Sequence, residues 1–172
     1  EGSLSADFYV TAAAALSDDR ADQINQVAGV DFISRSQWYS LSTADGPVEI
    51  WALGLPADHA PEVRIESGDR REAFAAWRDQ PAVLISEPFA SRRGLSVGDQ
   101  LTLPAGNQRP SLTIVGVYRD YASPTGVVLM RRSLYQRLYN DTAISGIGVH
   151  LRDSVRREAI RDPIERAVSG LA

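Results

Sequence analysis

Apolar and polar residues alternate along several short segments of the chain. The alternation is clearest in residues 101–103 and 112–118, and it recurs in residues 147–151. Because successive side chains of a strand point to opposite faces, each segment predicts a strand that packs one face on a core. Residues 82–85 differ, because their sequence Ala-Val-Leu-Ile is apolar throughout and predicts a strand buried on both faces.

Capping and turn residues predict further elements. Asp69 and Glu72 have the spacing of a capping box ahead of a helix that buries Phe74 and Trp77. The pair Asp-Gly at residues 45–46 predicts a hairpin turn. Other strands are predicted at residues 7–12, 30–35, 48–53 and 127–130, and other helices near residues 19–28, at 87–93 and 131–139, and after residue 153. This mixture of hairpins and β-α-β units indicates the α+β class.

Two of these elements are expected to be interrupted. The strand of residues 30–35 is expected to resume over residues 38–41 after a bend. Asp162 and Pro163 form a helix-start signature inside the last helix. We therefore expect that helix to break or kink at the proline.

The size and composition are those of an ordinary folded domain. The chain has 172 residues, of which 44% are hydrophobic and 23% charged, and a chain of this length can bury a self-sufficient core. All 18 basic residues are arginines, and the net charge is −4. The arginines are interleaved with acidic residues instead of forming a basic stripe, so we expect no binding to nucleic acid.

The chain contains no cysteine, which excludes disulfides and thiolate metal sites. No segment has the roughly 18 consecutive apolar residues of a membrane span. None has the pattern of a signal peptide. We interpret the chain as a segment of a longer protein, in which case these absences describe only this segment.

Residues 94–98 read Gly-Leu-Ser-Val-Gly and match the G-x-S-x-G pattern of a hydrolase nucleophile, with Ser96 at its centre. That chemistry needs the serine on a sharp turn from a strand into a helix. Here a predicted helix precedes Gly94, and Gly98 leads into a predicted strand. We therefore interpret Gly94 as a helix end and Gly98 as part of a turn. A secreted serine hydrolase that uses Ser96 and a histidine is kept as an alternative.

The other candidate groups are few. His59 and His150 are the only histidines, and we interpret them as surface or hydrogen-bonded structural residues. Asp18, Asp19 and Asp22 could be imagined as a cation site, but acidic residues in the first turn of a helix are explained by its dipole. No metal-ligand spacing and no Gly-rich phosphate loop is found. The sequence therefore predicts no catalytic, metal or cofactor site.

Trp38, Tyr39 and Trp51 gather aromatic surface within one predicted sheet. Aromatic side chains can anchor partner interfaces, but we interpret most of these three as core. The sequence assigns no residue to substrate or partner binding.

Three segments resemble a known family. Residues 83–103 contain Ile-Ser-Glu-Pro-Phe-Ala-Ser-Arg-Arg-Gly-Leu-Ser-Val-Gly-Asp-Gln-Leu, which is similar to a motif of MacB-like periplasmic domains that precedes a small β-rich unit. Residues 112–121, Leu-Thr-Ile-Val-Gly-Val-Tyr-Arg-Asp-Tyr, resemble the strand that follows it in that family. Residues 126–135 resemble a subset of large FtsX-like permeases. The chain thus resembles the extracytoplasmic domain, a MacB-like periplasmic core domain, of an FtsX/MacB-type ABC transporter permease.

The resemblance implies a fold in two parts. A porter-like β-α-β subdomain would be built from both chain ends, residues 1–66 and 124–172. A small β-rich, sabre-like subdomain would be inserted between them at residues 67–123. The resemblance also implies a place on the periplasmic side of the bacterial inner membrane, between two transmembrane helices.

The resemblance further implies a role in transport and not in catalysis. A separate cytoplasmic ATPase would hydrolyse ATP, and the permease would pass the motion outward to export or extract a lipid, lipoprotein, peptide or drug, or to signal outside the membrane. The implied partners are this ATPase, a second permease copy or second external domain, and a periplasmic adaptor, lipoprotein or lipid. No functional residue and no cofactor follow from the resemblance. A stand-alone extracytoplasmic ligand-binding module is the remaining alternative.

Overall fold

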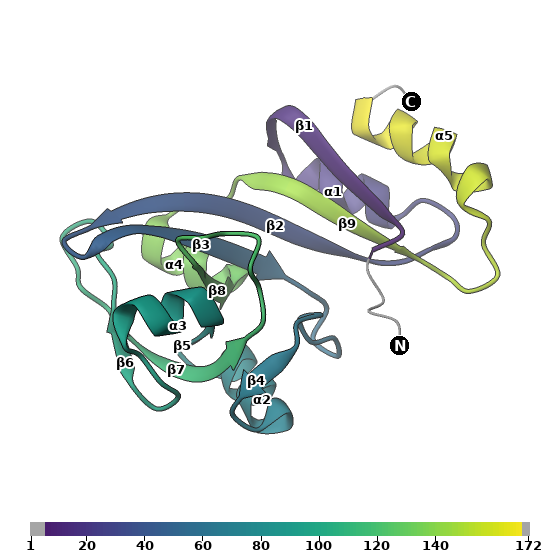
Figure 1. Ribbon diagram of the computed structural model, residues 1–172. Coiled ribbons are helices and arrows are strands. Elements are labelled where there is room, and N and C mark those ends of the chain that lie inside the picture. Colours follow the sequence, from purple (N-terminus) through teal and green to yellow (C-terminus); the bar gives the residue numbers. More distant parts are fainter. Residues whose placement is uncertain (1–5, 170–172) are drawn as a thin grey trace.

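A computed structural model describes residues 6–169, which form one mixed β-sheet with helices packed around it (Figure 1). The strands are β1 (Phe8–Leu16), β2 (Val30–Thr43), β3 (Gly46–Gly54), β4 (Ile65–Ser67), β5 (Ala82–Ser86), β6 (Gln100–Thr102), β7 (Ser111–Tyr118), β8 (Val127–Arg131) and β9 (Ile144–Leu151). The helices are α1 (Asp18–Asn25), α2 (Arg70–Asp79), α3 (Glu87–Arg93), α4 (Arg132–Tyr139) and α5 (Arg157–Ser169).

The sheet mixes parallel and antiparallel neighbours. Its strand order is β1-β9-β2-β3-β8-β5-β7-β4, with β6 paired to β7 outside this path. β3 and β8 are parallel, as are β5 and β7, whereas the other pairs are antiparallel. Tight hairpins and helical crossovers are therefore both present, and the expected α+β class is confirmed.

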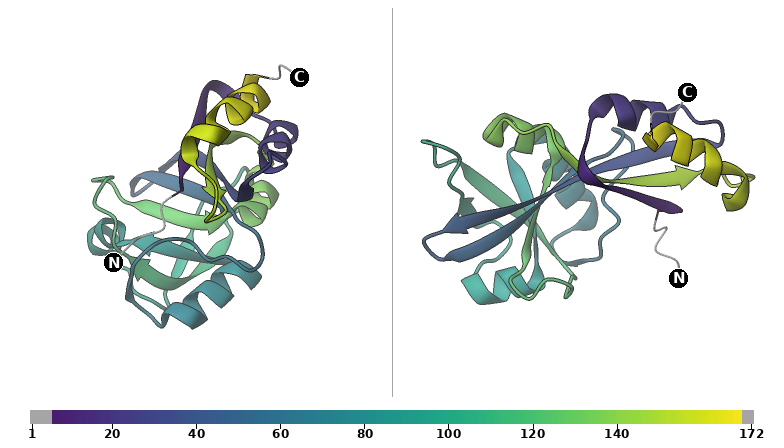
Figure 2. Two further views of the ribbon diagram at one scale, coloured as in Figure 1. Left: turned by 90° about the vertical axis from the view of Figure 1, so that its right-hand side faces the viewer. Right: turned by 90° about the horizontal axis from the view of Figure 1, so that it is seen from above.

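β2 is the strand that joins the two halves of the molecule. It runs for 14 residues, pairing with β9 over its first part and with β3 over its second. The expected bend before residue 38 is absent, because Arg35 and Ser36 pair with both neighbouring strands and carry the ladder across this point. Figure 2 shows β2 crossing from one end of the molecule to the other.

The buried residues form two regions, which we call the first and second lobes. The first lobe consists of β1, α1, the first half of β2, β9 and α5, and the second lobe consists of the other elements (Figures 1 and 2). The first-lobe core contains Val10, Leu16, Ala21, Ile24, Val30, Ile33, Ile144, Ile147, Val149, Ile160 and Ile164. The second lobe has one buried cluster on each face of its sheet, since neighbouring residues of β5 and β8 alternate between the two clusters.

The expected division of the chain near residues 66 and 123 stays a prediction. That division assigned β3 and β8 to the porter-like subdomain. In the structure both strands share a buried cluster with β5 and β7. Ile50 of β3 and Val128 of β8 lie in the same buried cluster as Ile85 and Ile114.

Local sequence signals account for several helix ends. Ser17 Oγ accepts the backbone N–H of Arg20 at 3.3 Å at the start of α1. Asp69 Oδ1 accepts the N–H of Glu72 at 2.9 Å at the start of α2. Gly94 ends α3 in the left-handed conformation, with φ of 62°, as the sequence predicts.

The last helix has no break at its proline, and the expected kink there stays a prediction. α5 continues from Arg157 through Pro163 to Ser169 without a break. Proline removes one helical hydrogen bond, but Ile160 before it and Ile164 after it are both buried in the first-lobe core. Burial on both sides of the proline thus favours one continuous helix.

Candidate functional site

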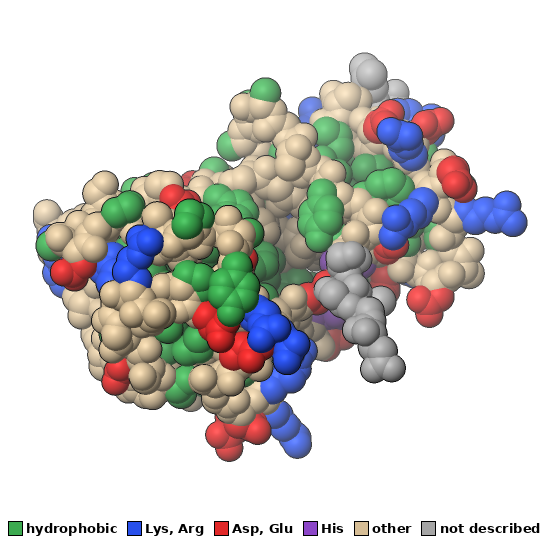
Figure 3. All heavy atoms as spheres, viewed as in Figure 1, with side chains coloured by type: hydrophobic (Ala, Val, Ile, Leu, Met, Phe, Trp, Pro, Cys, Tyr) green, Lys and Arg blue, Asp and Glu red, His purple; other side chains and the backbone are tan. Residues whose placement is uncertain are grey.

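A hollow of about 330 Å³ lies on the sheet between the two lobes, and we call it the trough. Side chains of β2 alternate between two faces: Ile33 packs with α1 in the first-lobe core and Tyr39 packs on Tyr139 of α4, whereas the even-numbered residues from 32 to 38 line the trough. The trough is therefore on the face of β2 that α1 and α4 do not cover. Figure 3 looks onto this region between the lobes.

The floor of the trough is made by small residues that face one another across paired strands. Ser34 of β2 pairs with Gly148 of β9, and Ser36 pairs with Gly146. A Cβ atom at position 148 would collide with Ser34 Oγ. Glycine at this position thus keeps the floor flat and open.

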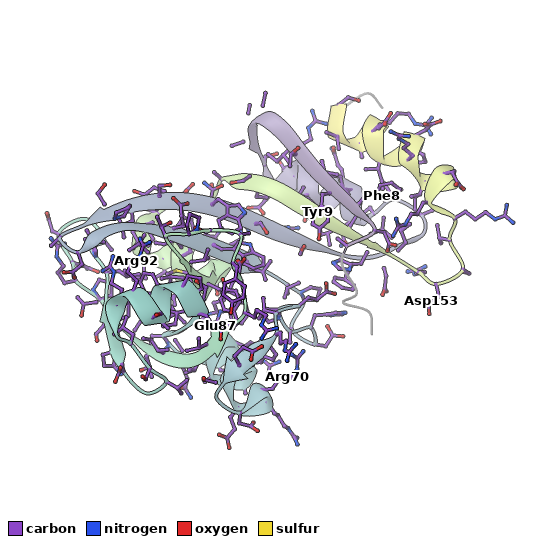
Figure 4. The ribbon with its side chains drawn as sticks, in the orientation of Figure 1. Phe8, Tyr9, Arg70, Glu87, Arg92 and Asp153 are labelled. Carbon is purple, nitrogen blue, oxygen red and sulfur yellow. The ribbon has the colours of Figure 1, made fainter. Side chains whose placement is uncertain are left out.

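Aromatic side chains form one wall. Trp38 and Trp51 are directly paired across β2 and β3, and their rings stack with centroids 5.4 Å apart and an interplanar angle of 6°. The indole N–H of Trp51 donates to Ser36 Oγ at 3.0 Å. Trp38 is 45% exposed and Tyr9, which lines the trough from β1, is 72% exposed. Figure 4 shows Tyr9 near the centre of this face.

The interpretation of the sheet aromatics as core is wrong for two of the three residues. Trp38 and Tyr39 are both exposed, at 45% and 37%, and only Trp51 is partly buried. They lie on opposite faces of β2, and Tyr39 packs on Tyr139 with ring centroids 5.5 Å apart. Trp38 instead forms part of the trough wall.

The two histidines meet at the other end of the trough. His150 stacks on Phe32 with ring centroids 4.1 Å apart, and His59 packs on the same ring at 3.9 Å. Nδ1 of His59 lies 2.9 Å from Asp58 Oδ1. Burial lowers the pKa of His150, against the opposing effect of the nearby Glu62 carboxylate. Both histidines therefore have structural contacts, as the sequence indicates, but they also line a hollow.

A second, more polar hollow of about 530 Å³ lies between α1 and α4. Two arginines bind acidic residues of α1: Arg35 donates to Asp18 and Asp22, and Arg132 donates to Asp18. Asp19 has no ion pair within residues 6–169. Arginine pairing and the helix dipole together account for these carboxylates, and no cluster able to hold a metal is found among the described residues.

Ser96 does not meet a histidine. It is exposed in the loop between α3 and β6, and its N–H donates to Asp99 Oδ2 at 2.9 Å. The shallow depression that it lines contains no histidine among the described residues, whereas His59 and His150 lie in the trough. The helix-to-strand context predicted from the sequence is present, so the geometry of a nucleophile elbow is absent.

The four floor residues belong to the part of the site that the sequence does not mark, and so do Tyr9, Phe32 and Glu62. Along β2 the trough face reads Phe32, Ser34, Ser36, Trp38, with large residues at both ends and small ones between. This spacing is visible in the sequence, but small polar residues in a strand carry no hydrophobic signal.

None of the helices in the described part of the chain is long and apolar enough to cross a membrane.

Comparison with known proteins gives consistent matches. The family model described as the MacB-like periplasmic core domain matches residues 2–167. An uncharacterized ABC transporter permease protein of Mycobacterium tuberculosis is 22% identical over 156 residues, which cover 88% of this chain and 18% of that protein. The chain thus spans about a fifth of the length of this curated relative.

Two solved structures have the same fold. The extracellular domain of the noncanonic ABC-type transporter YknZ from Gram-positive bacteria matches with a TM-score of 0.66 at 12% identity, covering 92% of this chain and 85% of that one. The periplasmic region of MacB from Actinobacillus actinomycetemcomitans matches with a TM-score of 0.66 at 12% identity, covering 92% and 75%.

Proposed function

The chain belongs to the family of MacB-like periplasmic core domains, and from this premise we propose that it is the extracytoplasmic domain of a bacterial ABC transporter permease. The observation that carries the proposal is the family match, which extends over residues 2–167. The fold shared with the YknZ and MacB external domains supports it. In this proposal the domain lies on the periplasmic side of the inner membrane, and its parent protein works with a cytoplasmic ATPase.

The proposed role is transmission of movement and not catalysis. ATP hydrolysis in the cytoplasm moves the membrane helices, and the domain converts that movement into export or extraction of a lipid, lipoprotein, peptide or drug, or into a signal outside the membrane. Partners in this role include a second permease copy or external domain and a periplasmic adaptor or lipoprotein. Both ends of the described chain belong to the first lobe (Figure 1), so movement would enter there.

The contacts between lobes support such a role. The lobes share the continuous strand β2, and α1 of the first lobe is tied to α4 of the second by the Asp18–Arg132 salt bridge of 3.0 Å. A polar hollow separates the rest of these two helices, with Asn25 on one side and Ser133 on the other. Bending of β2 where the lobes meet can change the angle between the lobes without unfolding either core.

A reversible cross-link across this hollow tests the proposal in the intact permease with its ATPase. The variant Asn25→Cys/Ser133→Cys is bridged with a thiosulfonate cross-linker that a reductant removes, since the domain has no cysteine of its own. We expect ATP-driven transport to stop on bridging and to return on reduction. Transport that continues in the bridged protein would contradict the role in transmission.

The matched control places the same bridge inside one lobe. Gln100 of β6 pairs directly with Thr113 of β7, so Gln100→Cys/Thr113→Cys is bridged without restraining the lobes. This variant is expected to keep its transport activity.

The single variant Ser133→Cys tests the location of the domain. A membrane-impermeant thiol reagent should label this cysteine in intact spheroplasts, and no labelling would contradict an external domain.

A further inference from the structure

The trough has the shape and lining of a small-molecule site. Its volume of about 330 Å³ lies at the lower end of the range for such sites. At about 3.3 Å per residue, the Cα atoms of Phe32 and Trp38 are separated by roughly 20 Å along β2. Between them the floor is flat, because the paired positions carry only Ser34, Ser36 and glycines. A flat or extended apolar body fits between the rings.

The floor offers few partners for hydrogen bonds. β9 is paired to β1 on one side and to β2 on the other, and β2 is paired to β9 and β3. The strand ladders thus occupy the backbone N–H and C=O groups beneath the trough. The Trp51 indole N–H is also taken, by Ser36 Oγ. An extended peptide, which needs backbone partners, is poorly served here, so the body that binds is apolar.

The histidine end of the trough carries negative charge. Glu62 lines this end, is exposed, and makes no ion pair within residues 6–169. No arginine is found among the described lining residues. His150 adds no charge at neutral pH, because burial lowers its pKa. Glu62 is thus the only carboxylate among the described lining residues.

The surroundings increase this negative field. Asp7 and Asp31 lie close enough to His150 to act on it electrostatically, together with Glu62. Asp58 lies beside His59. Asp7 is neutralised by Arg157 at 3.1 Å, which leaves the others to act on the hollow. Figure 3 shows acidic side chains beside the visible histidine surface.

We propose that the trough binds a small cationic amphiphile, a molecule with an apolar body and one positively charged end. The body lies on the serine and glycine floor against the faces of Trp38 and Trp51, and the cationic end lies beside Glu62. This inference deepens the proposed function. It rests on that function in one respect only, namely that the ligand reaches the trough from the outer side of the membrane.

Calorimetric titration of the 172-residue chain tests this inference. The probes share a dodecyl chain and differ in charge: dodecyltrimethylammonium, dodecyl sulfate and neutral dodecyl maltoside, all kept below micelle formation. We expect the cationic probe to bind about ten-fold or more tighter than the anionic probe, the effect of one close charge contact. Equal affinities, or tighter binding of the sulfate, would overturn the proposal.

Variants locate the binding. Trp38→Ala is expected to weaken binding of the cationic probe several-fold, and Glu62→Gln to reduce the preference for cation over anion. Gly146→Val fills the floor from the opposite strand, where an added Cβ makes only ordinary contacts, the nearest 3.5 Å from the Val10 carbonyl oxygen. It too is expected to weaken binding. Unchanged binding in all three variants would overturn the location.

The controls match the variants in type. Tyr121→Ala removes an aromatic ring that is 65% exposed and is not among the trough-lining residues, and Glu158→Gln removes an exposed carboxylate on α5. Both are expected to bind like the original chain. Because the titration needs no membrane and no ATP, a negative result would leave the transmission role standing. A failed cross-linking test would likewise leave the binding result standing.

Discussion

Arg132, the first residue of α4, donates to both carboxylate oxygens of Asp18, the first residue of α1, at 3.0 and 3.3 Å. The two residues belong to different lobes and lie 114 positions apart in the sequence. Arg132 also donates to the Thr142 carbonyl oxygen at 2.9 Å, and Arg35 donates to Asp18 at 2.9 Å. The carboxylate of Asp18 thus joins two arginines where the lobes meet.

Replacing Asp18 with asparagine is expected to lower the free energy of unfolding by about 1–2 kcal/mol. The Arg132 side chain is only 10% exposed and would lose its charged partner, whereas the Asp18 side chain is 41% exposed. The expected loss of unfolding free energy therefore lies between the values typical of buried and of surface salt bridges. Urea unfolding followed by circular dichroism measures the change.

Asp19→Asn is the control for this substitution. Asp19 lies in the same first turn of α1, so it shares the favourable interaction with the helix dipole, worth about 0.5 kcal/mol. It makes no ion pair in the described part of the chain. A loss as large as that of Asp18→Asn would contradict a special role for the salt bridge.

Gly126→Ala is expected to destabilise the second lobe by about 2–4 kcal/mol. Gly126 has φ of +85°, and an added Cβ would lie 2.5 Å from Phe89 Cβ and 2.6 Å from the Phe89 backbone nitrogen. Phe89 is fully buried and cannot move aside. The control is Gly94→Ala, which has φ of +62° but no atom near the added Cβ, so its expected cost is only about 1 kcal/mol. Thermal unfolding of both variants measures the two losses of stability. The difference between them is the cost of the collision, because both variants share the backbone strain.

Much of the fold is predictable because burial leaves a period in the sequence. The unbroken apolar run at residues 82–85 is buried throughout. The alternation over residues 112–118 and 147–151 matches β7 and β9. Helix ends at Asp69 and Gly94 follow from local hydrogen bonding and from the freedom of glycine. Each of these signals is contained within a few neighbouring residues.

The trough is not predictable in the same way, because cross-strand register creates it. Ser34 and Gly148 become neighbours only when β2 and β9 pair, and neither residue type marks a site. The exposure of Trp38 likewise depends on which helices cover each face of β2, and a single strand does not encode this. The break expected at Pro163 is absent for a different reason, because packing of the residues on both sides of the proline overrides the local helix-start signal.

Trp77→Ala is expected to cost about 3–5 kcal/mol. Trp77 is 4% exposed in the core of the second lobe, and its indole N–H donates to the Leu129 carbonyl oxygen at 3.1 Å. Removing it leaves a cavity and takes away a buried hydrogen bond. Phe74→Ala, on the same helix but only half buried, should cost clearly less. Chemical denaturation of the two variants makes the comparison, and equal losses would contradict this assignment of the core.

His150 is expected to make the stability of the first lobe depend on pH. Burial is the main cause that lowers the pKa of His150 from its ordinary value of 6.5, with Glu62 and Asp7 acting in the opposite direction. The unfolded chain therefore binds the proton more readily than the folded protein. The stabilisation is complete above pH 6.5, and it is lost as the pH falls from there through the lower pKa of the folded protein.

Unfolding free energies measured between about pH 8 and pH 5 should thus decline toward the acid side. His150→Gln is expected to lower stability at every pH, because it loses the stacking on Phe32, but to flatten the decline. His59→Gln leaves His150 in place and should retain most of the decline, because burial and not His59 is the largest cause of the lowered pKa of His150, although it loses contact with the same ring. If His150→Gln kept the full slope, another group would be responsible. The slope separates proton binding from packing, because the stacking contact itself does not titrate.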